Sequence, residues 1–214
     1  MKISQQTLSI LKNYNGLNQH FRANPGSTIR TISAAVIASA DIEEEFPIEF
    51  AVENLSKFLG VVSLFEDPEY EFYENYVRIS EGKNYVRYVY DEPTLLDLPP
   101  PASVKIKMPE VQIEFSLSEK DFTTIGRAIN SLASPELCIV GEDSTVYLRA
   151  TEVKNPTVSN FSMAVGVTED TFNTTFNAAN FRFLNRDYLV SLAINKIVRF
   201  QAPDVTYWIA ASKE

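Results

Sequence analysis

Basic side chains at helix surfaces are the residues of this chain whose types and spacing best suit a binding function. Isolated lysines and arginines attract phosphate groups without reading bases, so they suit non-specific contact with a polyanion such as nucleic acid. Each could equally be an ordinary solvated charge. Five of them lie on or beside four helices that apolar periodicity predicts: Lys12, Lys120, Arg127, Arg182 and Arg186.

The charge of the chain is distributed unevenly, although its sum is −9. Residues 1–17 hold two lysines, Lys2 and Lys12, and no acid. Between Asp41 and Asn75 stand eleven acidic residues and a single base, Lys57, so the rest of the chain is close to neutral. A solvated acidic surface that keeps the protein soluble explains this window by itself. The net charge therefore says little about any particular face, and a nucleic-acid partner stays possible.

Residue patterns that support catalysis are missing from the sequence. It has no phosphate-binding loop of the form GxxxxGK[ST], no GxSxG turn and no HExxH motif. The lone histidine, His20, is insufficient for a multi-histidine metal site. Acid pairs such as Glu66-Asp67 could serve metal-assisted or glycosidic chemistry, but a solvated strand edge is the simpler interpretation. We therefore expect a non-catalytic protein without a metal or other cofactor.

Compartment signals are few but agree with one another. The single cysteine, Cys138, cannot form an internal disulfide and lies in the apolar run "ELCIV", where a buried thiol is expected. No apolar run approaches the ~18 residues of a membrane helix, and the first residues lack the pattern of a secretory signal. We expect a protein of a reducing compartment without a membrane partner.

The elements that would position the basic residues are written twice along the chain. The stretch "FPIEFAVENL" (46–55) is answered by "FNTTFNAANF" (172–181), with Phe and Asn recurring 126 residues later. The helical segment "SQQTLSILKNYNGL" (4–17) is likewise answered by "SEKDFTTIGRAINSL" (118–132), at an interval of 114. Ser118, with Asp121 three residues on, has the pattern of a capping box. These intervals predict two copies of one unit.

A proline-rich stretch separates the two copies. The segment "DEPTLLDLPPPASVKIKMPE" contains five prolines and suits neither a central strand nor a helix interior. We predict an N-terminal domain at 1–92, a stiff linker at 93–108 and a C-terminal domain at 109–214. Short alternating runs such as "NFSMAVGV" predict half-buried strands around the helices. Each half is thus predicted to be α+β: an antiparallel sheet with two helices on one face, the second helix of half two being only a turn or two.

These elements together resemble a known family, the sliding clamps of T-even-type bacteriophages. The likeness is sharpest in "MKISQQTLSILKNYNGLN" at the start of the chain and in "FLGVVSL" at 58–64. The loops and the triple-proline linker depart from the family pattern. The resemblance implies the DNA-clamp fold: two similar domains per subunit, sheets outside, helices lining the hole of a homotrimeric ring.

The resemblance also implies a function and partners. It implies a processivity factor that encircles duplex DNA, is loaded by an ATP-dependent clamp loader, tethers the replicative DNA polymerase and acts in the cytoplasm of the infected host. Lys2 and Lys12 match family lysines on the first helix and would face the DNA. Partner peptides of such clamps usually dock into an apolar crevice near the linker.

Two alternatives remain at this point. The linker leucines that could border such a crevice, Leu95, Leu96 and Leu98, could instead only fasten the linker to the two cores. A structural virion protein built of tandem β-rich domains would also explain the repeat and the acidity, but not the basic first helix.

Overall fold

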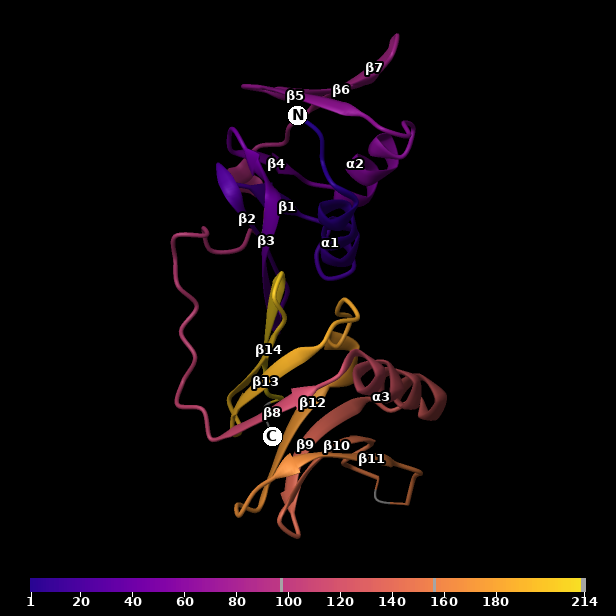
Figure 1. The fold of residues 1–214 in the computed structure, drawn as a ribbon, viewed down its shortest axis with the longest axis vertical. Coiled ribbons are helices and arrows are strands. Elements are labelled where there is room, and N and C mark those ends of the chain that lie inside the picture. The colour runs from indigo at the N-terminus through magenta and orange to yellow at the C-terminus, as the bar shows by residue number, and fades with distance from the viewer. Residues whose placement is uncertain (97, 156, 213–214) are drawn as a thin grey trace. The chain divides into compact units, whose positions relative to one another are not determined.

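The computed structural model describes residues 1–96, 98–155 and 157–212 (Figure 1). The chain divides into two compact units, Met1–Lys105 (unit 1) and Ile106–Glu214 (unit 2). The division lies inside the stretch 93–108 that the prolines mark as a linker. Each unit is described by itself below.

Unit 1 contains a four-stranded antiparallel set of strands. The last of the four in the chain, β4, lies at one edge, beside the first strand, β1. The order is β4-β1-β2-β3. The longest strand, β3, alternates between buried and solvent-facing residues over "VIASADIEEEF", which places Val36, Ala38 and Ala40 in the core. The strands are β1 (Phe21–Ala23), β2 (Gly26–Ile32), β3 (Val36–Phe46) and β4 (Phe50–Val52).

Three further strands of unit 1 form an antiparallel meander, β5 (Glu69–Tyr73), β6 (Tyr76–Glu81) and β7 (Asn84–Val89). Gly82 supplies the positive φ of 59° in the turn between β6 and β7. Phe50 and Phe72 lie with their ring centroids 5.4 Å apart, so aromatic side chains join the meander to the first sheet.

Two helices cover one side of the sheet of unit 1 (Figure 1), as the periodicity predicts. The helix α1 (Gln5–Asn15) begins at Ser4, whose hydroxyl accepts a hydrogen bond from the Thr7 amide at 3.2 Å. The helix α2 (Leu55–Val62) begins at Asn54, whose side chain accepts from the Lys57 amide at 2.8 Å. α2 packs on α1.

Unit 2 repeats the four-stranded sheet in the same order, β12-β9-β10-β11. A second set of antiparallel strands runs β8-β13-β14-β15, in which Trp208 of β15 lies opposite Arg199 of β14. The strands are β8 (Ile113–Leu117), β9 (Glu136–Glu142), β10 (Thr145–Thr151), β11 (Phe161–Val167), β12 (Phe172–Asn177), β13 (Tyr188–Ala193), β14 (Ile197–Gln201) and β15 (Val205–Ala210).

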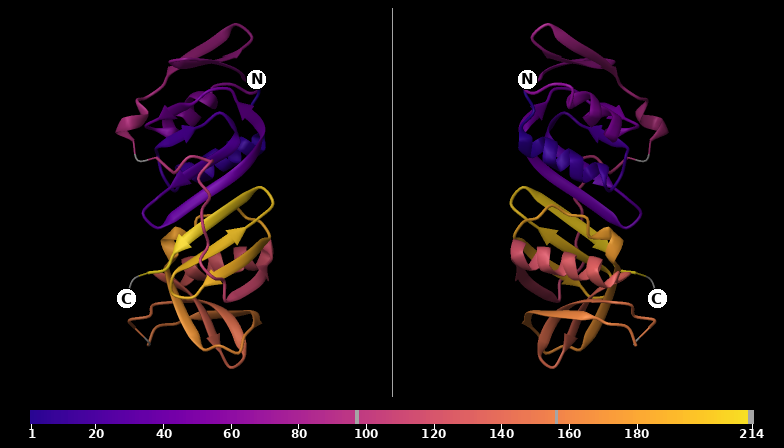
Figure 2. Two further views of the ribbon diagram at one scale, coloured as in Figure 1. Left: turned by 90° about the vertical axis from the view of Figure 1, so that its left-hand side faces the viewer. Right: turned by 90° about the vertical axis from the view of Figure 1, so that its right-hand side faces the viewer.

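The helices of unit 2 differ from those of unit 1. The helix α3 (Glu119–Leu132) begins at Ser118, which accepts from the Asp121 amide at 3.2 Å, so the predicted N-terminal cap is confirmed. Figure 2 shows α1 and α3, each running across the strands of its own unit. In place of α2 there is only the 3-10 turn η2 (Ala178–Asn180). The second helical segment of unit 2, expected to be only a turn or two, is thus a single 3-10 turn.

The remainder of the repeat appears in both units. Ser4 and Ser118 both cap helices, Phe50 and Phe176 both lie in the edge strand, and a three-stranded meander follows. The 3-10 turn η1 (Pro93–Leu95) begins the proline-rich linker. Cys138 is buried, as expected.

One glutamate of the acidic window is part of the framework rather than a solvated charge. Glu44 of β3 is half-buried and accepts hydrogen bonds from the Ser4 amide and from the Thr7 hydroxyl, the latter at 2.5 Å. Burial by itself would raise the pKa of Glu44, but the hydrogen bonds from Thr7 and Ser4 outweigh it and lower the pKa. The carboxylate thus fixes the start of α1 to the sheet.

We expect Glu44→Gln to lower the free energy of unfolding by about 1–2 kcal/mol at neutral pH, because two charge-assisted hydrogen bonds weaken. A lowered pKa in the folded state gives stability that is present above the ordinary glutamate pKa and is lost as pH falls through the folded value. The difference between the native chain and Glu44→Gln in urea denaturation should therefore shrink below about pH 4. Glu43→Gln, an exposed neighbour on β3, is the control. Equal effects of both substitutions would contradict this role.

Candidate nucleic-acid interface

The exposed face of α1 carries positive charge without acid. Lys12 is exposed in the last turn of the helix, and the helix sequence "QQTLSILKNYN" contains neither aspartate nor glutamate. A cation in the last turn also interacts favourably with the helix dipole. Lys12 can therefore reach a phosphate without giving up a carboxylate partner on its own helix.

Lys2 lies elsewhere than the family pattern implies. It precedes the helix, which begins only at Gln5, and its ammonium group pairs with Asp67. The hydrogen bond to Asp67, against a smaller effect of burial, raises the pKa of Lys2. Both side chains are more than half exposed, at 57% and 69%. The expectation that Lys2 belongs to the first helix is thus wrong, because Ser4 caps α1 after it, and its charge is partly neutralised.

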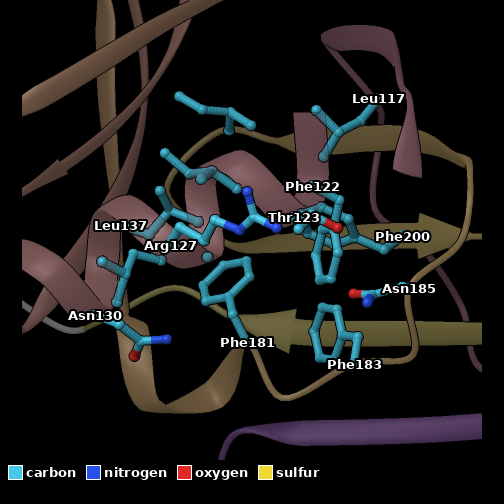
Figure 3. A pocket seen from close by; sticks show the side chains of 14 residues that line it. Leu117, Phe122, Thr123, Arg127, Asn130, Leu137, Phe181, Phe183, Asn185 and Phe200 are labelled. Carbon is cyan, nitrogen blue, oxygen red and sulfur yellow. The ribbon is translucent and has the colours of Figure 1, made fainter. Parts of the chain in front are cut away.

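The helix α3 brings Lys120 and Arg127 together on one face. Both are exposed, and seven residues of α-helix return a side chain to nearly the same direction about 10.5 Å further along the axis. Glu119 and Asp121 occupy the first turn, where the helix dipole favours acids. Arg127 extends over a hollow beside the helix (Figure 3). The two cations therefore form a pair that could span neighbouring phosphates.

Arg182 and Arg186 lie in the segment after η2 rather than on a helix. Arg182 is exposed beside a second hollow that Gly126 and Asn130 of α3 also line. Arg186 is half-buried, and its Nη2 lies 3.1 Å from Oδ2 of Asp204. Hydrogen bonding to Asp204 raises the pKa of Arg186. Arg186 thus ties this segment to the turn between β14 and β15, which leaves it less available to a phosphate than Arg127.

The linker leucines lie at the start of the segment between the two units. Leu96 and Leu98 are half-buried, and the side chain of Leu95 lies outside the described part of the structure. A hollow of about 530 Å³ does open at the start of the linker, but Tyr90, Pro93 and four carboxylates line it: those of Glu49, Glu74, Asp91 and Glu92. A partner docking there would meet negative charge.

An arginine that the sequence does not single out holds the linker in place. Nη1 of Arg30, on β2, donates to the carbonyl of Pro101 at 2.6 Å and to that of Val104 at 2.8 Å. Its Nε donates to the Ser39 hydroxyl at 3.2 Å. No spacing pattern flags a lone strand arginine whose acceptors lie about seventy residues away. The linker is therefore attached to unit 1 by side-chain hydrogen bonds as well as by the chain.

Over residues 1–96, 98–155 and 157–212 the structure has no cluster of three or more metal-ligating side chains. None of the helices described in it is long and apolar enough to cross a membrane.

Comparison with known proteins gives whole-length matches. The chain is 30% identical over 220 residues to the sliding clamp of Vibrio phage KVP40, covering 98% of both chains. It is 23% identical to the sliding clamp of Escherichia phage RB69, covering 98% of this chain and 96% of that one. Among solved structures, A. fulgidus PCNA bound to the C-terminal region of FEN-1 matches with a TM-score of 0.73 and 12% identity, over 100% and 99% of the two chains. No family model matches the chain.

Arg30→Met should loosen the linker, because methionine has a similar length but donates no hydrogen bond to Pro101 or Val104. Losing two hydrogen bonds from a charged donor makes local opening about tenfold more frequent or more. Under native conditions, trypsin should cleave Arg30→Met after Lys105 and Lys107 faster than it cleaves the native chain, by a similar factor. Mass spectrometry of the products measures the rate. Arg78→Met, which removes an exposed cation paired with Glu71 on the same unit, is the matched control. Unchanged cleavage in Arg30→Met would contradict the assignment.

Proposed function

The chain belongs to the sliding clamps of T-even-type bacteriophages, and from this premise we propose that it acts as a processivity factor in DNA replication. The observation that carries the proposal is the identity of 30% over nearly the entire length of a phage clamp, together with a fold that is shared with DNA clamps. In this role the protein encircles duplex DNA and tethers the replicative polymerase, without catalysis of its own. A structural virion protein has no comparable support.

The proposed contact with DNA uses the exposed cations of the helices. Lys12 on α1 and the pair Lys120 and Arg127 on α3 attract phosphates without reading bases, which a protein that slides requires. Lys2, Arg182 and Arg186 contribute less in this proposal, since Lys2 and Arg186 already pair with carboxylates. Such sparse contacts give binding of only about 10⁻⁴–10⁻⁶ M, so the topology of a ring must supply the residence time.

We infer that the subunits join through their edge strands into a homotrimer. Within the described chain β7 pairs only with β6 and β11 only with β10, so each unit has an open strand edge. Both edges expose apolar side chains: Val89 of β7 is 58% exposed and Val167 of β11 is 87% exposed. Edges of this kind are templates for pairing with another chain. Two different edges per subunit make a head-to-tail contact that closes into a ring when the rotation allows.

The other proposed partners are an ATP-dependent clamp loader and the replicative polymerase, in the cytoplasm of the infected bacterium. Support for peptide partners comes from the similar PCNA structure, which holds the C-terminal region of FEN-1. In this chain the linker leucines Leu96 and Leu98 are half-buried at the segment where the family docks such peptides. They remain candidates for the border of that crevice, as does Leu95.

The assembly is expected to have about three times the chain mass of 24.1 kDa in light scattering. Val167→Arg should reduce this to the monomer mass, because an arginine on the edge of β11 places an unpaired charge in the contact. Leu64→Arg, at an apolar residue that is 69% exposed but lies outside the strands, should leave the trimer intact. A stable native monomer at high concentration would refute the ring.

Lys12→Glu combined with Arg127→Glu should impair retention on DNA at least tenfold while the mass of the assembly stays unchanged. The charge reversal turns phosphate attraction into repulsion at one place in each unit. The measurement is retention on nicked circular DNA after loading, compared with linear DNA, from which a ring slides off. The control is Lys83→Glu with Lys196→Glu, exposed basic residues in the turn from β6 to β7 and in the turn from β13 to β14, outside both the helices and the strands of the proposed contact. Normal retention of the first variant would remove the helices from the DNA-facing surface.

A further inference from the structure

The helix α3 buries less of its surface against unit 2 than α1 buries against unit 1. α1, with 11 residues, buries five side chains, whereas α3, with 14 residues, buries only Phe122 and Ile125. The apolar stripe continues beyond them: Ile129 is only half-buried and Leu132 is 37% exposed. An apolar stripe of this length on a helix normally has a packing partner.

The internal repeat indicates what is missing. In unit 1 the chain leaves the edge strand β4 and forms α2, which buries Leu55, Phe58 and Val62 and packs on α1. In unit 2 the chain leaves the equivalent edge strand β12 and forms only the three residues of η2. Each unit therefore has the same place for a second helix, and unit 2 leaves that place without one.

Two adjoining hollows occupy this place. One, of about 220 Å³, has a floor of Phe122, Phe183 and Phe200 and is seen in Figure 3 beside Phe181. The other, of about 590 Å³, lies against Ala178 and Ala179 of η2. Both are bordered by the same residues: Gly126, Ile129, Asn130 and Phe181. They form one apolar groove along α3, which we call the α3 groove.

Gly126 leaves the backbone of α3 without a side chain along the groove. A glycine inside a helix costs about 1 kcal/mol relative to alanine. A Cβ added at Gly126 would nevertheless meet nothing within 4 Å, so no neighbour within the chain requires the glycine. A glycine on a helix face lets the backbone of another segment approach closely. The α3 groove is thus open at the point where a second helix would come nearest.

The charge around the α3 groove limits the occupant. Arg127 reaches over the first hollow, where Thr123, Asn130 and Asn185 supply neutral polar groups (Figure 3). Arg182 lines the second hollow. Among the described residues that line the two hollows there is neither aspartate nor glutamate, in a chain whose net charge is −9. The occupant should therefore be apolar on one side and acidic along its edge.

We propose that the α3 groove binds a short amphipathic helix of a partner protein, with apolar residues spaced as in α2 and carboxylates facing Arg127. The apolar side chains of the partner enter the two hollows in the way that Leu55, Phe58 and Val62 cover unit 1. This site lies within unit 2 and is separate from the crevice expected at the linker. Arg127 is also one of the cations proposed above to contact DNA, so partner and DNA would compete for it, and the test therefore uses the intact assembly without DNA.

The probe is a fluorescein-labelled peptide with the sequence of residues 53–65, carrying Lys57→Glu to add the acidic edge. We expect saturable binding to the full-length protein by fluorescence anisotropy, with a Kd on the order of 10–100 μM, since a short helix must fold as it binds. The same peptide with Phe58→Ser should bind at least tenfold more weakly. Methyl NMR should show shifts at Ile125 and Ile129 on binding.

Gly126→Leu is the decisive variant, because a Cβ at this position meets nothing within 4 Å and the added side chain takes up space that the groove leaves open. It should weaken peptide binding at least tenfold. Gly60→Leu makes the same change at an exposed glycine of α2 that also has nothing within 4 Å, and it should leave binding unchanged. Equal binding to both variants, or no saturable binding by the native protein, would overturn the proposal. A change in the mass of the assembly in Gly126→Leu alone would also overturn it, since the groove would then join copies of this chain.

Discussion

The sheets of this protein bury apolar side chains that need a cover of helices or loops, and providing that cover is the constraint from which the remaining structure follows. A strand such as β3 alternates strictly, so its inward residues are buried only if a helix lies over them. In unit 1 two helices do this. In unit 2 a single longer helix shares the task with aromatic residues of an irregular segment, where Phe183 stacks on Tyr207 with ring centroids 4.1 Å apart. Helix position, and with it the placement of the surface cations, is therefore set by core packing.

Much of this architecture can be predicted from the sequence because it depends on local patterns that occur twice. The caps at Ser4 and Ser118 and the apolar periodicity of α1, α2 and α3 require only near neighbours in the chain. The division into similar halves follows from the recurring Phe and Asn residues together with the prolines. Sequence reasoning also identifies Lys12, Lys120 and Arg127 as exposed helix cations, although their role on DNA remains a prediction.

The features that sequence reasoning misses depend on partners far apart in the chain. In the sequence Glu44 is one of three adjacent glutamates that are all expected to be solvated. In the structure its carboxylate accepts hydrogen bonds from Ser4 and Thr7 at the start of a helix that lies about forty residues earlier in the chain. The sequence predicts Lys2 to be a cation of the first helix, whereas in the structure it forms an ion pair with Asp67. Arg30 has no local signature, and its acceptors belong to the linker. The acidic window therefore has structural as well as solvating members, and only tertiary contacts distinguish them.

The position of Trp208 on β15 has a practical consequence for spectroscopy. It is the only tryptophan of the chain, and it belongs to unit 2. Its intrinsic emission therefore follows the melting of one half of the chain, while far-ultraviolet circular dichroism averages over both. Two compact units need not unfold in a single cooperative step, so midpoints from the two signals can differ. Such a difference would reveal how strongly the halves depend on one another.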